Sequence, residues 1–250
     1  MDAKVTLENM YGGRTLVFGH RGASAYAPMN TIPAFELARQ QGADGIELDV
    51  HRTKDEHVVV LHDFSVDATT NGTGDISHMT LSQLKSLDAG SWFDASFANT
   101  PIPTLEEVFL AVGRSLFINI EIKSRTIESD GLEAMVANLI QKYGMQDRVI
   151  VSSFNPYAIM RFRGIIANVP IAFLTAPDFH IPPPDGLVYE ASHPYEGSLN
   201  ETTISEYRAV APIINTWTVN DADRAVELAK MGVNGIITDN PSAILQALGR

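Results

Sequence analysis

The chain has 250 residues, a formal net charge of −12 and no cysteine. Disulfides and thiolate metal centres are therefore excluded, and the acidic balance argues against a general nucleic-acid surface. A hydrophobic fraction of 45% and a charged fraction of 19% are typical of a globular protein with its own core. An anionic substrate stays open, because a bound cation can reverse the field inside one pocket.

The first twenty residues contain no basic region followed by a long apolar run, so the sequence predicts no secretory signal. No segment reaches the roughly 18 to 20 apolar residues that span a bilayer. We therefore expect a cytoplasmic protein without stable membrane insertion and without a nucleic-acid partner.

Short apolar runs alternate with helical patterns along most of the chain. Residues 15–20 (TLVFGH) predict a strand, and residues 30–42 predict a helix that stops at a glycine. Residues 79–88 predict one short helical piece within a polar stretch. Further strands are predicted at 45–50, 57–63, 116–123, 148–154, 170–175, 186–192, 212–219 and 235–239, and further helices at 104–113, 130–144, 155–168, 221–232 and 241–249.

This alternation predicts parallel β/α units, and about eight strands in one chain favour a closed (β/α)₈ TIM barrel. A doubly wound open sheet is the rival, but no glycine fingerprint follows the first strand. We expect residues 1–250 to form a single domain. The polar stretch at 64–103 is interpreted as a small insertion at the catalytic rim.

Acidic side chains gather where predicted strands end. Glu47 and Asp49 are spaced i, i+2 and so share a face opposite aliphatic neighbours, and Glu121 and Lys123 repeat the pattern in NIEIK. Active sites of barrels lie at these strand ends. Three inward carboxylates repel one another unless a cation offsets them, and oxygen ligands suit Mg²⁺ or Ca²⁺. The alternative is that Lys123 only neutralises Glu121 as a structural pair.

Two histidines and two cations complete the pattern. His20 and Arg21 end the first strand, His62 precedes Asp63 at the end of residues 57–63, and Lys123 follows the third carboxylate. Arginine and lysine suit phosphate oxygens, and two imidazoles supply an acid and a base near neutral pH. The set predicts phosphoryl transfer on a diester, whose alkoxide leaving group needs a proton.

The segments GHRGASAYAPMNTIPAF, GIELDV, VVVLHD and IEIK together resemble the glycerophosphodiester phosphodiesterase family, and TWTVND and GVNGIITDNP extend the resemblance toward the C-terminus. The resemblance implies a TIM barrel and metal-dependent hydrolysis of small glycerophosphodiesters to sn-glycerol 3-phosphate and an alcohol. By motif, the resemblance assigns the acid–base pair to His20 and His62, and the ligands of one divalent cation to Glu47, Asp49 and Glu121. It assigns the phosphate contacts to Arg21 and Lys123, and an aromatic near the substrate to Trp217.

The sequence departs from the family pattern at two positions. The family usually has glutamate where this chain has Met29, and arginine where it has Ala68. Neither change removes a residue of the implied site, but Met29 bears on substrate preference. Attack by the substrate's own hydroxyl, through a cyclic phosphate, and direct attack by water both remain open.

Several expectations concern residues outside these motifs. His193, at a predicted strand end, is a further candidate for substrate binding. Phe93, Phe154 and Tyr195 either line the pocket or pack under loops, and His180 is expected in an exposed proline-rich loop.

Two alternative functions remain. A lysophospholipase D-type enzyme for lipid substrates would need an apolar approach, which Trp92, Phe93 and Phe97 of the insertion could supply. A barrel that binds phosphodiesters without cleaving them is the other. Assembly into a homo-oligomer is left open.

Overall fold

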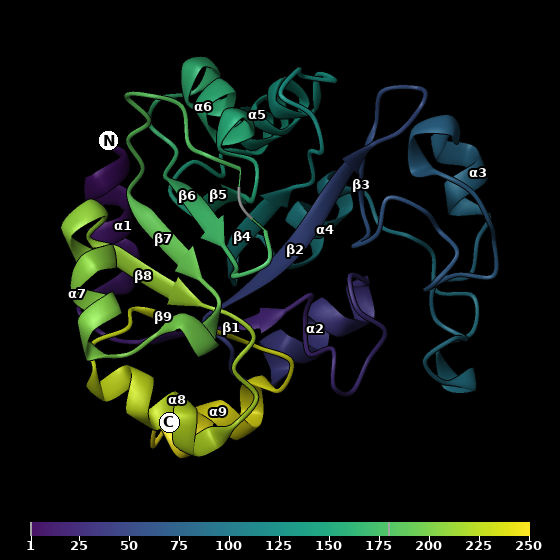
Figure 1. Cartoon of the computed structure of the whole chain (residues 1–250). Coiled ribbons are helices and arrows are strands. Elements are labelled where there is room, and N and C mark those ends of the chain that lie inside the picture. Colours follow the sequence, from purple (N-terminus) through teal and green to yellow (C-terminus); the bar gives the residue numbers. More distant parts are fainter. Residues whose placement is uncertain (1, 180) are drawn as a thin grey trace.

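Eight parallel strands close into a barrel in the computed structural model of the protein, which describes residues 2–179 and 181–250 (Figure 1). β1 pairs with both β2 and β9, and this closes the ring and excludes the open doubly wound sheet. The TIM barrel prediction is confirmed. Position 180, expected in an exposed loop, lies outside the described residues. The barrel strands are β1 (Leu16–His20), β2 (Gly45–Arg52), β4 (Phe117–Ile122), β5 (Val149–Ser153), β6 (Ile171–Thr175), β7 (Ala191–Pro194), β8 (Ile213–Thr216) and β9 (Gly235–Thr238).

A ninth strand, β3 (Val58–Val60), pairs antiparallel with β2 and stands outside the ring. The segment that follows lies to one side of the barrel and carries α3 (Leu81–Lys85) and two short 3₁₀ turns, η1 (Ile76–His78) and η2 (Ala95–Phe97) (Figure 1). It has a small apolar cluster of its own, which includes Val66, Ile76, Leu84 and Ile102.

Helices surround the barrel, and two of them were not predicted from the sequence. α1 (Ala3–Tyr11) covers the amino-terminal end of the barrel, where Leu7 and Tyr11 pack against residues that begin the strands. α7 (Glu201–Val210) precedes β8. The others are α2 (Ile32–Gln40), α4 (Leu105–Val112), α5 (Leu132–Tyr143), α6 (Pro156–Ile165), α8 (Ala222–Lys230) and α9 (Pro241–Ala247).

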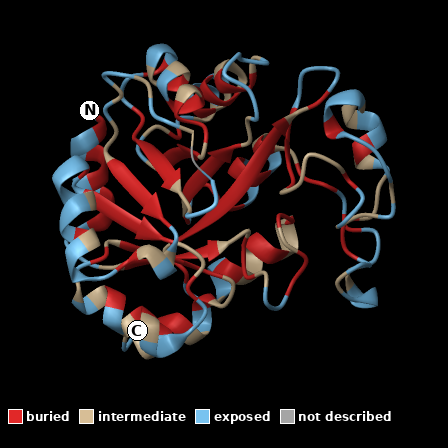
Figure 2. Ribbon diagram, in the orientation of Figure 1, coloured by how far each residue is buried: buried red, intermediate tan, exposed pale blue. Residues whose placement is uncertain are grey.

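The main core lies between the strands and the surrounding helices (Figure 2). Ile46, Leu48 and Val50 of β2 point outward into it and are fully buried. Each such side chain stabilises the fold by about 1.5–3 kcal/mol. Because strand residues alternate, Glu47 and Asp49 of the same strand must point into the barrel. Within the described residues, no helix is both long and apolar enough to cross a membrane.

Candidate active site

Three carboxylates from two neighbouring strands meet in the carboxyl-terminal mouth of the barrel. Glu47 and Asp49 lie on β2 and Glu121 on β4, and the parallel register places Asp49 beside Glu121. One oxygen of each lies within 4.8 Å of the others, and the three residues are 5%, 1% and 8% exposed. Such an arrangement of oxygen atoms suits a divalent cation.

Two cations border these carboxylates. The Lys123 Nζ lies 3.0 Å from Glu121 Oε1 and 3.3 Å from Asp49 Oδ1. The Arg21 Nε lies 3.5 Å from Asp49 Oδ2, and the Arg21 backbone N–H donates to Glu47 Oε2 at 3.1 Å. The sequence left open that Lys123 only neutralises Glu121 as a structural pair. Lys123 does pair with Glu121, and it also contacts Asp49.

The electrostatics of the three carboxylates are unequal. Burial, with repulsion from Asp49 and Glu121, raises the pKa of Glu47 well above its usual range. Burial likewise raises the pKa of Glu121 to about 7, although Lys123 opposes it. Burial acts on Asp49 too, but Lys123 and Arg21 outweigh it and lower the pKa of Asp49. Without further positive charge, full ionisation of the three groups near neutral pH is unfavourable.

The residues present fit a hard divalent cation. The three carboxylates offer only oxygen ligands, and the buried Asp49 Oδ1 has an ion-pair contact with Lys123 Nζ at 3.3 Å but no hydrogen bond from the described residues. One lysine ammonium is shared between Asp49 and Glu121, so three buried carboxylates within 4.8 Å still carry negative charge that a metal would offset. An added double positive charge would also relieve the repulsion that raises the pKa of Glu47.

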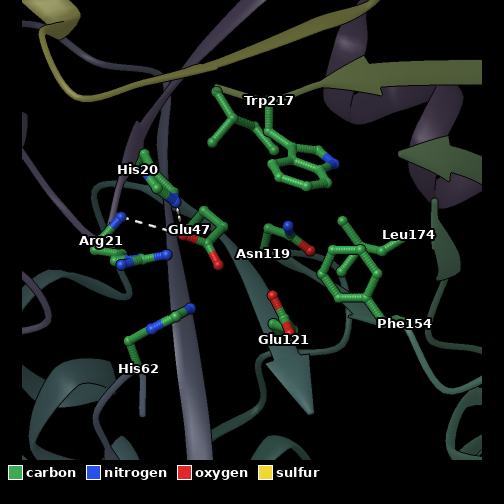
Figure 3. A pocket seen from close by; sticks show the side chains of 10 residues that line it. His20, Arg21, Glu47, His62, Asn119, Glu121, Phe154, Leu174 and Trp217 are labelled. Atoms are coloured by element: carbon green, nitrogen blue, oxygen red, sulfur yellow. Dashed lines mark hydrogen bonds and ion pairs between the residues drawn. The ribbon is translucent and has the colours of Figure 1, made fainter. Parts of the chain in front are cut away.

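His20 is held at the end of β1 by a partner from the other end of the chain. Its Nδ1 lies 2.7 Å from Asp239 Oδ1, and its Nε2 lies 4.0 Å from Glu47 Oε2 (Figure 3). Burial would raise the pKa of Asp239, but hydrogen bonds from His20, Asn220 and Ser24 lower it to about 2. Asp239 is therefore ionised and fixes the ring of His20, with Nε2 left for the cavity.

The turn after His20 depends on a glycine. Arg21 adopts φ 57° and Gly22 φ 89°. A Cβ on Gly22 would lie 2.6 Å from the backbone carbon of Ala34, so the close approach of α2 leaves no room for a side chain there. This turn aims the Arg21 backbone N–H at the carboxylate of Glu47.

His62 faces the same cavity from the segment after β3. Its Nδ1 lies 2.7 Å from Asp63 Oδ1. Burial lowers the pKa of His62, Asp49 opposes this, and the cations Lys123 and Arg21 lower it further. The ring is therefore neutral at pH 7, and the contact with Asp63 leaves Nε2 free. The structure brings His20, Arg21, Glu47, His62 and Glu121 around one cavity of about 260 Å³ (Figure 3).

Aromatic and neutral polar side chains complete the cavity wall (Figure 3). Trp217 and Phe154 meet edge to face with ring centroids 5.4 Å apart, and Trp217 Nε1 donates to the backbone oxygen of His193 at 2.9 Å. Phe154 thus lines the pocket. Tyr195 packs against Trp217 at 5.8 Å between centroids, behind the wall.

Other predicted side chains lie elsewhere. His193 is fully buried in β7, where its Nε2 lies 2.9 Å from Asn215 Nδ2, and it does not line the cavity. We therefore leave it out of the substrate-binding set. Trp92, Phe93 and Phe97 pack on one another within the insertion and do not line the cavity, so they supply no apolar approach to it.

Some residues of the site were not assigned roles from the sequence. Asp239 was visible only as a polar residue at a strand end, 219 positions from its partner His20. Asn119 lines the cavity floor with both amide atoms unpartnered among the described residues, and the alternation in FINIEIK could have identified it. Asn30 Nδ2 donates a hydrogen bond to Asp49 Oδ2 at 2.8 Å and so positions that carboxylate.

Comparison with known proteins agrees with this geometry. Residues 20–243 match the model of the glycerophosphoryl diester phosphodiesterase family. A glycerophosphodiester phosphodiesterase of Caldanaerobacter subterraneus is 40% identical over 93% of this chain and 97% of its own.

Solved structures agree as well. A phosphodiesterase of Oleispira antarctica in complex with the product sn-glycerol-3-phosphate superposes with a TM-score of 0.85 at 28% identity, covering 96% of this chain and 99% of its own. A glycerophosphodiester phosphodiesterase of Agrobacterium tumefaciens gives a TM-score of 0.79 at 30% identity, covering 93% and 99%. The chain therefore belongs to the glycerophosphoryl diester phosphodiesterase family of enzymes.

Proposed function

We propose that this protein hydrolyses glycerophosphodiesters to sn-glycerol 3-phosphate and an alcohol with one divalent cation, Mg²⁺ or Ca²⁺. The observation that carries the proposal is the convergence of Glu47, Asp49 and Glu121 within 4.8 Å, with two imidazoles on the same cavity. The Oleispira relative in complex with sn-glycerol-3-phosphate supports the product. We also propose that residues 1–250 form one catalytic domain in which 64–103 is inserted.

Glu47, Asp49 and Glu121 would hold the cation. When bound, it supplies Lewis-acid polarisation of the phosphoryl oxygens and offsets the charge that develops on them. Arg21, which lines the cavity, and Lys123, whose Nζ contacts Glu121 and Asp49, would bind the non-bridging oxygens. Their charges then stabilise the transition state, in which negative charge spreads over those oxygens.

The two histidines take opposite parts in proton transfer. Because the pKa of His62 is lowered, its Nε2 is free to accept the proton of the attacking hydroxyl. His20, whose ring is oriented by the contact of Nδ1 with Asp239, would donate a proton from Nε2 to the departing alkoxide as the phosphorus–oxygen bond breaks. The attacking oxygen is either water or a hydroxyl of the substrate's glycerol.

The test is a panel of diesters scored for released sn-glycerol 3-phosphate, with and without chelator. We expect release from glycerophosphodiesters, loss on chelation and recovery with Mg²⁺ or Ca²⁺. Indifference to chelation would contradict the metal, and binding without turnover under any divalent ion would support a non-catalytic barrel. Turnover of lysophosphatidylcholine in preference to glycerophosphocholine would support the lysophospholipase D alternative.

The acid and base assignments have their own test in pH–rate profiles. His62→Ala should lose the acidic limb of kcat/KM and His20→Ala the basic limb, since each limb reports one of the two groups. Retention of both limbs in either variant would contradict the assignment.

A further inference from the structure

A second cavity, of about 290 Å³, continues the active-site cavity toward solvent. The two share Glu121 and Phe154 as a common wall. The active-site cavity is lined in part by buried residues of the barrel, Leu174 and Ile237. The second ends at exposed residues, since Phe179 is 45% exposed. A substrate bound at the carboxylates therefore has open space beside Glu121, and a separate cavity lined by Met29 borders His20 and Arg21 on another side.

The open space beside Glu121 suits the half of the substrate that changes from one diester to the next. In a glycerophosphodiester, the glycerol phosphate is constant and the alcohol varies. A variable group needs space that extends to solvent, and the freed alcohol needs an exit. The second cavity meets both requirements, and it shares Glu121, a ligand of the proposed metal, with the active-site cavity.

One arginine sets the charge of this second cavity. The Arg125 guanidinium carbon lies 3.6 Å from the centroid of the Phe64 ring, and His51 contacts the same ring edge to face at 4.8 Å. Phe64 is thus held by its neighbour and gives the guanidinium a fixed stacking surface. Within residues 2–179 and 181–250, no carboxylate lies within 4.0 Å of Arg125.

The other charges of this cavity compensate each other. Lys123 lies 3.0 Å from Glu121 and 3.3 Å from Asp49, both of which are ligands of the proposed metal. The remaining lining is neutral: Phe64, Ile122, Ser124, Ser153, Phe154, Ala176 and Phe179. Arg125 therefore adds an uncompensated positive charge to a largely apolar cavity.

We propose that this second cavity binds the alcohol half of the phosphodiester, and that Arg125 makes it favour alcohols that are anionic or uncharged over alcohols that are cationic. The inference rests on the proposed function. A carboxylate or phosphate on the alcohol gains a charged partner at Arg125. A quaternary ammonium meets a like charge on the aromatic face that would otherwise bind it.

The test compares three diesters that differ only in the alcohol: glycerophosphoglycolate, glycerophosphoglycerol and glycerophosphocholine, with anionic, uncharged and cationic alcohols. We expect the wild-type kcat/KM to fall in that order. The glycolate-to-choline ratio should drop about fivefold in Arg125→Gln and further in Arg125→Glu. About 0.5 M salt should reduce the wild-type ratio, because exposed charges are screened.

Two variants serve as checks on this reading. Arg114→Gln removes the same charge from an exposed position before β4, at the opposite end of the barrel, and should leave the ratio at its wild-type value. Phe64→Leu keeps Arg125 but removes its stacking surface, and should lower the ratio as Arg125→Gln does. Thermal unfolding of each variant shows that a changed ratio belongs to a folded enzyme.

Three results would overturn the inference. The first is an unchanged ratio in both Arg125 variants while all three diesters are still hydrolysed. The second is a wild-type preference for choline that Phe179→Ala abolishes, since the aromatic rings would then bind the cation. The third is a ratio that responds to Met29→Ala instead, because Met29 lines a different cavity, behind His20. Failure of the wild type to hydrolyse any of the diesters would contradict the proposed function itself.

Discussion

The two halves of the barrel rim have the same architecture and different chemistry. Strands β1, β2 and β4 carry ionisable side chains toward their carboxyl-terminal ends, among them His20, Asp49 and Glu121, and form what we call the charged half. Strands β5 to β8 present neutral polar or aromatic groups, such as Ser152 and Trp217, the residue after β8. The cavity lies between the halves and takes its walls from both (Figure 3).

This difference separates chemistry from shape. The charged half holds groups that can bind a cation and move protons, and its carboxylates repel one another when no cation is bound. The neutral half supplies rigid surfaces, as where the Trp217 indole is fixed by the backbone oxygen of His193. We expect substitutions in the charged half to lower kcat, and those in the neutral half to change KM.

The largest effect is expected from the carboxylates. Asp49→Asn keeps the shape but removes a charge on which the proposed metal, Lys123 and Arg21 all converge. Loss of several kcal/mol of charge stabilisation corresponds to about a 10³-fold lower kcat/KM. Steady-state kinetics and metal titration measure it, with Glu36→Gln, a partly exposed carboxylate paired with Arg39 on α2, as control. Activity within tenfold of wild type would break the division between the halves.

The next effect is expected at His62. Because a positioned acid or base contributes about 10²–10⁴-fold, His62→Ala should lower kcat by that factor with little change in KM. His78→Ala is the matched control, since His78 is exposed in the insertion. An equal loss in both variants would show that the fold, and not the proton transfer, had been damaged.

A smaller and different effect is expected from the neutral half. Trp217→Leu removes the ring that meets Phe154 at 5.4 Å and should raise KM about three- to tenfold, because the glycerol half loses a flat apolar surface. We expect kcat to stay within about threefold. A large fall in kcat with constant KM would show instead that Trp217 contributes to the chemical step.

The smallest effect concerns stability in the neutral half. Full burial lowers the pKa of His193 to about 3 from 6.5. Below pH 6.5 the unfolded chain binds a proton at His193 and the folded chain does not. The contribution of neutral His193 to the free energy of unfolding is therefore complete above pH 6.5 and is lost as pH falls toward 3. His193→Gln removes this titration but retains an acceptor for Asn215.

Urea unfolding of the wild type and His193→Gln at pH 7 and pH 5 measures this contribution. The wild type should lose about 2 kcal/mol relative to the variant between these values, since carboxylates common to both cancel in the difference. A difference that is independent of pH would show that His193 titrates normally.

The barrel and the charged half of its rim could be predicted from the sequence because their signals are local. Alternation within GIELDV and FINIEIK fixes which side chains share a face. α7 was missed because Ile204 is its one buried residue within the described chain, which leaves almost no apolar period to detect. The run of valines in β3 predicted a strand, and its antiparallel pairing with β2 follows from the short turn between Thr53 and His57, a local signal that was not used.

Contacts between distant segments could not be predicted in this way. The partner of His20 and the stacking of Arg125 on Phe64 depend on how the ring closes and how loops cross it, and neither leaves a periodic pattern. The neutral half gave weaker signals for the same reason. Its side chains shape the cavity by where they lie, and their residue types are common in ordinary cores, so the sequence does not distinguish them.

The closure of β1 against β9 has a consequence for synthesis of the protein. His20 is made early, and Asp239, which orients its ring, follows the last strand of the barrel. A growing polypeptide on the ribosome thus carries the His20 imidazole unoriented until β9 and Asp239 have emerged. The newborn enzyme would become competent only once β9 has paired with β1 and Asp239 has reached His20.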